Sequence, residues 1–281
     1  MQIIRDISTL RKEIKAARQV NKAIGLVPTM GFLHAGHLSL IRQASQENDM
    51  VIISIFVNPI QFGMGEDFEE YPRDLEGDAS LAEQSGCHII YAPTIKEMYP
   101  QGYATFVDVE HLTEGLCGAS RPGHFRGVTT VVAKLFNIVT PDHAYFGQKD
   151  AQQALVIQRM AEDLNMDVNV VIMPTVREAD GLAMSSRNTF LTPQQRTAAT
   201  ILSRSLREAE IKIKSGQRDT NAIIQFIYQA IANEPLANID YIDIVDIEEI
   251  KPIEKINGRA LIALAVRFGK TRLIDNIIVE V

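Results

Sequence analysis

Two histidines flanked by glycines form the first segment that could carry chemistry. The stretch PTMGFLHAGH, residues 28–37, places His34 and His37 three positions apart, directly after the apolar run AIGLV. If a strand ends there and a helix begins, the loop gains free backbone N–H groups and the positive end of a helix dipole. Imidazole groups at such a helix start add donors for phosphate oxygens. The segment therefore predicts an anion site.

Two other interpretations of the histidine pair stay open. The spacing could mark half of a zinc site, although no cysteine, HExxH motif or second close histidine pair supplies a third ligand. The residues could also be ordinary loop histidines, although Gly31 and Gly36 beside them argue against this.

Three further polar segments follow predicted strands. FVNPIQFGMGEDFEEYPRD (56–74) carries Asn58 and Gln61, whose amides suit hydroxyl and carboxylate groups without adding charge. YFGQKDAQQ (145–153) has Lys149 at a turn, Asp150 as a helix cap and Gln153 about one turn later. GLAMSSRN (181–188) could grip phosphate. Each segment also has a plainer interpretation: the first could be an ordinary loop, the second could carry a solvated lysine, and the third could be a bare linker.

Alternating strands and helices must position these segments. Strands are predicted at 23–29, 50–58, 87–93, 143–147 and 167–176, and helices at 36–48, 73–86, 126–141 and 150–165. Repeated strand–helix units imply a Rossmann-like parallel sheet covered by helices on both faces. In such α/β folds, ligands bind beyond the carboxyl ends of the strands.

The pattern changes after about Val176. A helix is predicted over 192–216, with Thr192 as N-cap, Pro193 at the first helical position and Gly216 as its stop. A second helix over 220–233 precedes strands at 239–247, 259–268 and 271–281. We expect a first domain over 1–176 and a smaller α+β domain over 177–281.

Composition and charge narrow the class of protein. The 281 residues are 46% apolar and 22% charged, as in ordinary globular proteins. A net charge of −7 argues against binding long nucleic acid. The N-terminus lacks the apolar centre of a signal peptide, and no apolar run is long enough to span a membrane. We expect a cytoplasmic protein with Cys87 and Cys117 reduced, although one disulfide stays possible.

Several of these motifs together resemble a known family. His34-Ala35-Gly36-His37 resembles the HxGH signature of the nucleotidyltransferase superfamily, which includes the class I aminoacyl-tRNA synthetases. PTMGFLHAGHLSLI, FVNPIQFG, YPRD, RPGHFRGV, YFGQKDAQQ and MSSRN occur here in the order of the pantothenate synthetase (pantoate–β-alanine ligase) family. The likeness is dense from residue 26 to about 190 and continues in length and pattern through the C-terminal third.

The resemblance implies a reaction. ATP and pantoate would give pantoyl adenylate and pyrophosphate, and the amine of β-alanine would then displace AMP to form pantothenate. It also implies Mg²⁺ with the ATP, a homodimer, and a C-terminal domain that acts as a lid over the active site.

The resemblance also assigns site residues. His37 would be the proton donor, while His34 and Lys149 would support the phosphates. Gln61 would contact pantoate and β-alanine, and Gln153 would hold pantoate. ATP would be bound by Met30, Gly31, Phe32, Leu33, His34, Ala35, Gly36, His37, Gly147, Gln148, Lys149, Asp150, Val176, Met184, Ser185, Ser186 and Arg187. Asn58, Tyr71 and Arg121 match family positions near the site, and no protein-held metal is expected.

Rival functions stay open at this stage. Another adenylyl- or cytidylyltransferase of the superfamily, a non-catalytic nucleotide sensor and a zinc hydrolase would each share some of these features. A tRNA-charging enzyme is disfavoured because the short acidic chain has no candidate anticodon domain. GKT at 269–271 is no P-loop, because it follows a strand and Leu264 replaces the first glycine.

Overall fold

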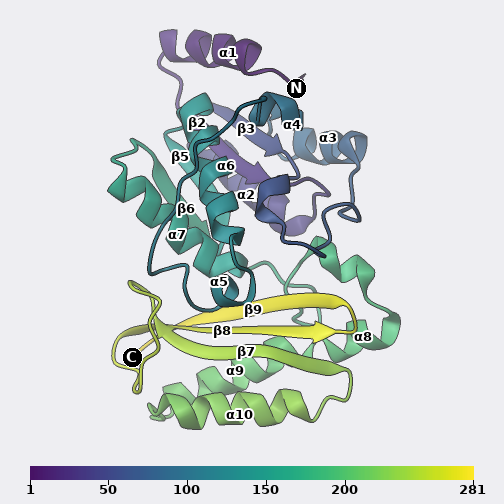
Figure 1. Cartoon of the computed structure of the whole chain (residues 1–281), viewed down its shortest axis with the longest axis vertical. Helices are drawn as coiled ribbons and strands as arrows, with labels where there is room; N and C mark the ends of the chain where they lie inside the picture. Colours follow the sequence, from purple (N-terminus) through teal and green to yellow (C-terminus); the bar gives the residue numbers. More distant parts are fainter. The chain divides into compact units, whose positions relative to one another are not determined.

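Six parallel strands form the sheet of the first part of the chain (Figure 1). The computed structural model describes residues 1–281. The strands are β1 (Gln2–Ile4), β2 (Ile24–Thr29), β3 (Met50–Ile55), β4 (Ile89–Tyr91), β5 (His143–Gly147) and β6 (Asn169–Met173). The connecting elements are α1 (Ile7–Gln19), α2 (Ala35–Glu47), η1 (Pro59–Gln61), α3 (Leu75–Gln84), α4 (Ile95–Met98), α6 (His124–Val139), η2 (Gln148–Asp150) and α7 (Ala151–Asp163).

The order of the strands creates a switch point. They pair in the order β1-β4-β3-β2-β5-β6, and every pair is parallel. From β2 the chain continues to β3 on one side, and later places β5 on the other side. Loops after strands that flank such a reversal leave in opposite directions and open a crevice at the carboxyl edge. The loops after β2, β3 and β5 therefore share one edge.

Helices cover both faces of this sheet. Val27 of β2 belongs to an apolar cluster with Leu40 and Ile41 of α2 and Ala82 of α3. Its neighbour Leu26 points to the opposite face, because side chains alternate along a strand, and it is equally buried. Helix α6 packs against β2 and against α1. The expected doubly covered α/β sheet is confirmed.

A second, antiparallel sheet occupies the C-terminal part. Strands β7 (Ala237–Asp246), β8 (Arg259–Phe268) and β9 (Thr271–Glu280) pair in that order, with Gly269 and Lys270 forming the tight turn between β8 and β9. The remaining helical segments are α5 (Cys117–Ser120), η3 (Ser186–Phe190), α8 (Pro193–Ala198), α9 (Ile201–Lys214) and α10 (Thr220–Ala232).

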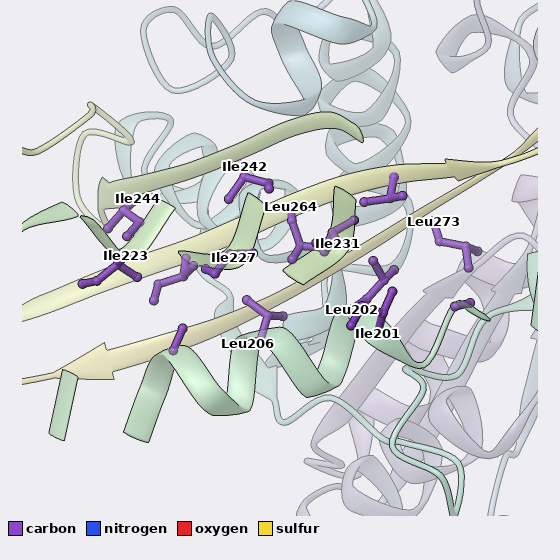
Figure 2. Close-up of a cluster of buried hydrophobic side chains, with 14 of the residues drawn as sticks. Ile201, Leu202, Leu206, Ile223, Ile227, Ile231, Ile242, Ile244, Leu264 and Leu273 are labelled. Atoms are coloured by element: carbon purple, nitrogen blue, oxygen red, sulfur yellow. The ribbon is translucent and has the colours of Figure 1, made fainter. Parts of the chain in front are cut away.

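The core of this part lies between the sheet and two helices. Figure 2 shows aliphatic side chains of α9 and α10 gathered against those of the sheet. The helices contribute Ile201, Leu202, Leu206, Ile223, Ile227 and Ile231, and the strands contribute Ile242, Ile244 and Leu264. Most of these side chains have no measurable exposure. Each fully buried Ile or Leu contributes about 1.5–3 kcal/mol, so this cluster stabilises the packing of the two helices on the sheet.

The chain forms two compact units. The first comprises residues 1–109, 121–147 and 156–174, and the second comprises residues 110–120, 148–155 and 175–281. Two short segments that precede the C-terminal part, residues 110–120 and 148–155, therefore belong to the second unit. None of the helices combines the length and the apolar character that crossing a membrane requires.

The structure corrects some element predictions. The helix predicted over 192–216 is two helices, α8 and α9. The Thr200 hydroxyl donates to Thr197 O at 2.8 Å. Backbone hydrogen bonds between residues three positions apart, from Thr200 N to Thr197 O and from Leu202 N to Ala199 O, replace the α-helical pattern there. The strand predicted to reach Val176 ends at Met173, because Pro174 has no N–H to pair. Strand β1 and helix α1 were not predicted at all.

Candidate active site

The two histidines lie at the start of helix α2, directly beyond strand β2. His34 is the N-cap residue, and its Nδ1 accepts a hydrogen bond of 3.2 Å from the backbone N–H of Gly36. His37 Nδ1 accepts one of 3.3 Å from the backbone N–H of His34. The imidazole rings stand 4.0 Å apart between centroids. Histidine side chains here cap the helix as serine or aspartate usually does.

These contacts select one tautomer for each neutral ring. Because Nδ1 of His34 and of His37 faces a backbone N–H, it must carry a lone pair. The ring proton then sits on Nε2 in both residues. Each imidazole thus offers an Nε2–H donor, and the two donors lie beside a helix N-terminus whose dipole attracts anions.

A buried carboxylate shapes the loop that precedes the histidines. Asp78 of α3 is 3% exposed, and its two oxygens accept from the backbone N–H groups of Phe32 at 2.8 Å and Leu33 at 2.6 Å. Gly31 and Phe32 both have positive φ, at 85° and 52°. Burial raises the pKa of Asp78, while the two backbone hydrogen bonds oppose that rise. The carboxylate holds a loop conformation that the backbone would otherwise disfavour.

Gln61 and Asn58 lie on the loop that follows strand β3. Asn58 is 1% exposed and Gln61 is 9% exposed. Asn58 Nδ2 donates to Gln61 Oε1 and to Gly127 O, both at 3.0 Å. Gln61 Nε2 lies 3.3 Å from the sulfur of Met30, which comes from the loop after β2. The structure thus brings the first two predicted segments together.

Helix α6 supports the same loop from its first two turns. A Cβ on Gly127 would lie 2.5 Å from Gln61 Cα, so only glycine permits this approach. His124 Nδ1 lies 2.9 Å from Gln61 O, an acceptor, so Nδ1 carries the proton and Nε2 can accept from Arg121 at 2.9 Å.

Arg121 is also held by a carboxylate. Its guanidinium forms two bonds to Glu66, of 2.6 and 2.7 Å. Burial raises the pKa of Glu66, but the hydrogen bonds and charge of Arg121 outweigh burial and lower it to about 2. Tyr71 is buried, and its ring lies 6.4 Å from that of Phe62 on the same loop.

The second unit holds the Lys149 turn. Gly147 ends strand β5 in the first unit, and Gln148, Lys149 and Asp150 follow as a 3₁₀ turn before α7. Asn276 of β9 donates from Nδ2 to the carbonyl groups of Gln148 and Lys149, both at 2.9 Å. Lys149 Nζ lies 3.8 Å from the Asp150 carboxylate. A buried amide therefore fixes the backbone that carries the lysine.

The first turn of α7 has a second anchor. Gln152, next to the predicted Gln153, accepts from Cys117 N at 3.0 Å and donates to Leu112 O and Gly115 O at 2.9 Å each. These bonds attach residues 110–120 to the helix start. Gln153 is half-buried beside them.

Val176 and the MSSRN segment meet in a small loop of the second unit. Met184 N donates to Val176 O at 3.0 Å, and Ser185 caps η3 by accepting from Arg187 N at 3.2 Å. Ser186 is 7% exposed. The Arg177 guanidinium fixes the loop base through two bonds to Asp275, of 2.7 and 2.9 Å.

The candidate residues thus form two groups. One, in the first unit, comprises Met30, Gly31, Phe32, Leu33, His34, Ala35, Gly36, His37, Asn58, Gln61, Tyr71, Arg121 and Gly147, and the other, in the second unit, comprises Gln148, Lys149, Asp150, Gln153, Val176, Met184, Ser185, Ser186 and Arg187. Asp78, His124 and Asn276 were not predicted as site residues. Asp78 left a signal as an acid among the apolar positions of a predicted helix, and His124 lies in the RPGHFRGV segment, but nothing in the sequence marks Asn276.

The set of donors does not form a protein metal site. No group of three or more His, Cys, Asp and Glu side chains could hold a metal ion. Cys87 and Cys117 are both free and buried.

A parallel sheet whose switch point carries histidine donors at a helix start defines a nucleotide-binding α/β enzyme. Comparison with known proteins makes the assignment specific. A family profile described as pantoate-beta-alanine ligase matches residues 2–278. The chain belongs to the pantoate–β-alanine ligase family.

Individual relatives agree over the whole chain. Pantothenate synthetase of Heliobacterium modesticaldum is 61% identical over 281 residues, which cover 100% of both chains. That of Pelotomaculum thermopropionicum is 60% identical over 278 residues and 99% of both chains.

Solved structures agree as well. The crystal structure of pantothenate synthetase from Thermus thermophilus has a TM-score of 0.94 at 45% identity, covering 99% of both chains. Pantoate-beta-alanine ligase from Francisella tularensis, complexed with beta-gamma ATP and beta-alanine, has a TM-score of 0.80 at 35% identity, covering 99% of this chain and 97% of that one.

Proposed function

We propose that the chain condenses pantoate with β-alanine to form pantothenate, and that it activates pantoate as the acyl adenylate. A carboxylate oxygen of pantoate attacks the α-phosphorus of ATP and pyrophosphate leaves. The amine of β-alanine then attacks the acyl carbon, loses a proton and displaces AMP. The observation that carries this proposal is family membership over residues 2–278 together with the paired histidines at a helix start.

The residues of the first group suit the activation step. Attack of a carboxylate on ATP brings two anions together, so the site must supply positive potential where pyrophosphate departs. The Nε2–H groups of His34 and His37 and the N-terminus of α2 provide it. In this proposal His37 is the proton donor, and the loop Met30–His37 lines the nucleotide.

The amides suit the acid substrates. Gln61 would bind pantoate and β-alanine, and Gln153 would bind pantoate. Holding the carboxylate in line with the α-phosphorus recovers up to roughly 7–11 kcal/mol of the barrier, because the entropy of encounter is lost on binding. Asn58, Tyr71 and Arg121 would support this side of the site.

The candidate residues of the second unit suit the binding of the nucleotide. Gly147–Asp150 would bind ATP, with Lys149 on its phosphates, and Val176 would meet the adenine. Met184–Arg187 would close over the triphosphate as part of a C-terminal lid, which would keep water from the acyl adenylate.

The proposed partners are Mg²⁺ and a second copy of the chain. Mg²⁺ would arrive with ATP, because the protein offers no cluster of ligands for a resident ion. The enzyme would act as a homodimer in the cytoplasm. Metal analysis and light scattering on the purified protein test the first two statements directly.

The experiment that tests the function is a product assay. The purified chain, incubated with ATP, pantoate and β-alanine, should form AMP, pyrophosphate and pantothenate in equal amounts. Formation of ADP would point to a different activation chemistry. ATP binding without AMP would identify a nucleotide sensor instead of an enzyme.

A further inference from the structure

Tyr99 is hydrogen-bonded to the side-chain amide of Asn58, which in turn contacts Gln61, and the function described above gives Tyr99 no role. Its hydroxyl donates to Asn58 Oδ1 at 2.7 Å, across 41 positions of sequence. Asn58 in turn donates from Nδ2 to Gln61 Oε1 at 3.0 Å. Tyr99, Asn58 and Gln61, all of the first unit, thus form one continuous chain of hydrogen bonds, called here the amide relay.

The direction of the amide relay is fixed by chemistry. Gly127 O can only accept, so the atom of Asn58 that lies 3.0 Å from it must be Nδ2. Asn58 Oδ1 then faces Tyr99, whose hydroxyl must donate. The second hydrogen of Nδ2 points to Gln61, which must present Oε1 in that direction. Gln61 therefore has Nε2 left for other contacts, near Met30.

We propose that Tyr99 is a positioning residue that acts through Asn58 to keep the Gln61 amide with its Nε2–H donors toward the acid substrate. Carboxylate oxygens only accept hydrogen bonds, so a Gln61 amide turned by 180° would present the wrong atom. The inference rests on the proposed function for the identity of that substrate. It also gives Asn58 a specific role, as the link in the amide relay between Tyr99 and Gln61.

Burial gives the relay its strength. Asn58 is 1% exposed, so its Oδ1 is shielded from bulk water and depends on the Tyr99 hydroxyl as its donor. A buried acceptor without a partner is unstable, and Asn58 would shift or turn to regain one. Either movement would release Gln61 from its single orientation.

The ring of Tyr99 is held independently of its hydroxyl. It packs 6.1 Å from the Phe56 ring and 5.0 Å from the Tyr103 ring, and Lys134 Nζ lies 5.7 Å from its centroid. Phenylalanine at position 99 keeps all of these contacts. Tyr99→Phe therefore removes only the donor that begins the relay.

Tyr91 offers a matched control in the same unit. Its side chain has no measurable exposure, and its hydroxyl donates to the sulfur of Met98 at 3.7 Å and to neither amide of the relay. Tyr91→Phe removes one buried hydroxyl without touching Asn58. A general effect of losing a hydroxyl from the first unit would appear in both variants.

Steady-state kinetics test the proposal. In Tyr99→Phe we expect the KM for pantoate to rise about 5- to 30-fold while the KM for ATP stays within a factor of two. Tyr91→Phe should match the wild type. In a Gln61→Ala background, Tyr99→Phe should add nothing further, because the residue on which it acts is gone. Asn58→Ala should reproduce the effect if Tyr99→Phe does not fold.

An unchanged pantoate KM in Tyr99→Phe would overturn the proposal, and so would an equal loss with and without Gln61. Side-chain amide NMR signals of ¹⁵N-labelled protein give a readout independent of turnover. The Gln61 signals should shift in Tyr99→Phe and not in Tyr91→Phe, and unshifted signals would also refute the relay. If the wild type makes no pantothenate, the proposed function fails while the NMR comparison still decides on the relay.

Discussion

The carboxylate of Asp78 accepts a hydrogen bond of 2.6 Å from the backbone N–H of Leu33, one residue before the first histidine of the HxGH segment. Its other oxygen accepts from Phe32. An acid on α3 thus sets the path of a loop 45 positions away in sequence. The placement of both imidazoles depends on that path.

Replacing Asp78 should therefore impair turnover without removing any group that contacts substrate. Asp78→Ala leaves two backbone N–H groups without their acceptor, and we expect kcat to fall about 10- to 100-fold because the loop shifts. Unfolding in urea should show a loss of about 1–3 kcal/mol.

Asp6 provides the control for Asp78. It caps α1 by accepting from Thr9 N at 2.8 Å in the same unit. Asp6→Ala should lower stability, because the helix loses its N-cap, and should leave kcat unchanged. Equal kcat values for the two variants would show that Asp78 has no special link to the histidines.

The cationic and imidazole groups of the site should each matter strongly for the rate. We expect His37→Ala and Lys149→Ala to lower kcat by about 10²- to 10³-fold, a typical loss for one donor to a transition state. His111→Asn and Lys214→Ala, at side chains 68% and 70% exposed, serve as controls and should keep normal rates. A near-normal rate in either site variant removes that residue from the mechanism.

Gly127 should not tolerate a side chain. In Gly127→Ala the new Cβ would stand 2.5 Å from both Gln61 Cα and Ile60 O, so η1 must move. We expect a stability loss of about 1–3 kcal/mol and a raised KM for pantoate. Gly115→Ala, whose Cβ would meet nothing nearer than Ile250 O at 4.0 Å, should be nearly neutral in both measurements. A neutral Gly127→Ala would contradict the close packing of α6 on the Gln61 loop.

The ion pair of Glu66 with Arg121 should make stability depend on pH. The folded pKa of Glu66 is lowered to about 2, so its contribution is complete above the unfolded pKa near 4.5 and is lost as pH falls toward 2. Because both side chains are partly exposed, we expect about 1–2 kcal/mol at pH 7.

Urea unfolding of the wild type and of Glu66→Gln measures the contribution of the Glu66 carboxylate to the free energy of unfolding. The wild type should be more stable at pH 7, and the gap should narrow steadily between pH 4.5 and pH 2.5. A gap that stays constant over this range would mean that the carboxylate charge contributes nothing.

Much of this fold could be predicted from the sequence because its strands are short apolar runs separated by amphipathic helices. The run MVIISI became the central strand β3, and HAYFG matched β5 without error. The split between α8 and α9 could not be predicted, because it depends on a threonine hydroxyl that bonds back to the chain. Strand β1 was missed because three residues give no period to detect.

The candidate site likewise contains residues that could be predicted from the sequence and residues that could not. The residues proposed to face a ligand fall in short recognisable segments, so His34, Gln61 and Lys149 could be proposed from sequence alone. The residues that hold them, such as Asp78 and Tyr99, lie in unrelated segments. Their partners are backbone groups and amides brought close only by folding, so even the buried acid that the helix pattern marks at position 78 could not be matched to its partner from the sequence.

The transfer of oxygen from pantoate to AMP tests acyl activation most directly. Pantoate labelled with ¹⁸O in both carboxylate oxygens is incubated with the enzyme, ATP and β-alanine, and the products are analysed by mass spectrometry. If the carboxylate attacks the α-phosphorus, each AMP carries one ¹⁸O and the amide of pantothenate keeps the other. Unlabelled AMP, or label found in pyrophosphate or inorganic phosphate, would contradict the adenylate pathway.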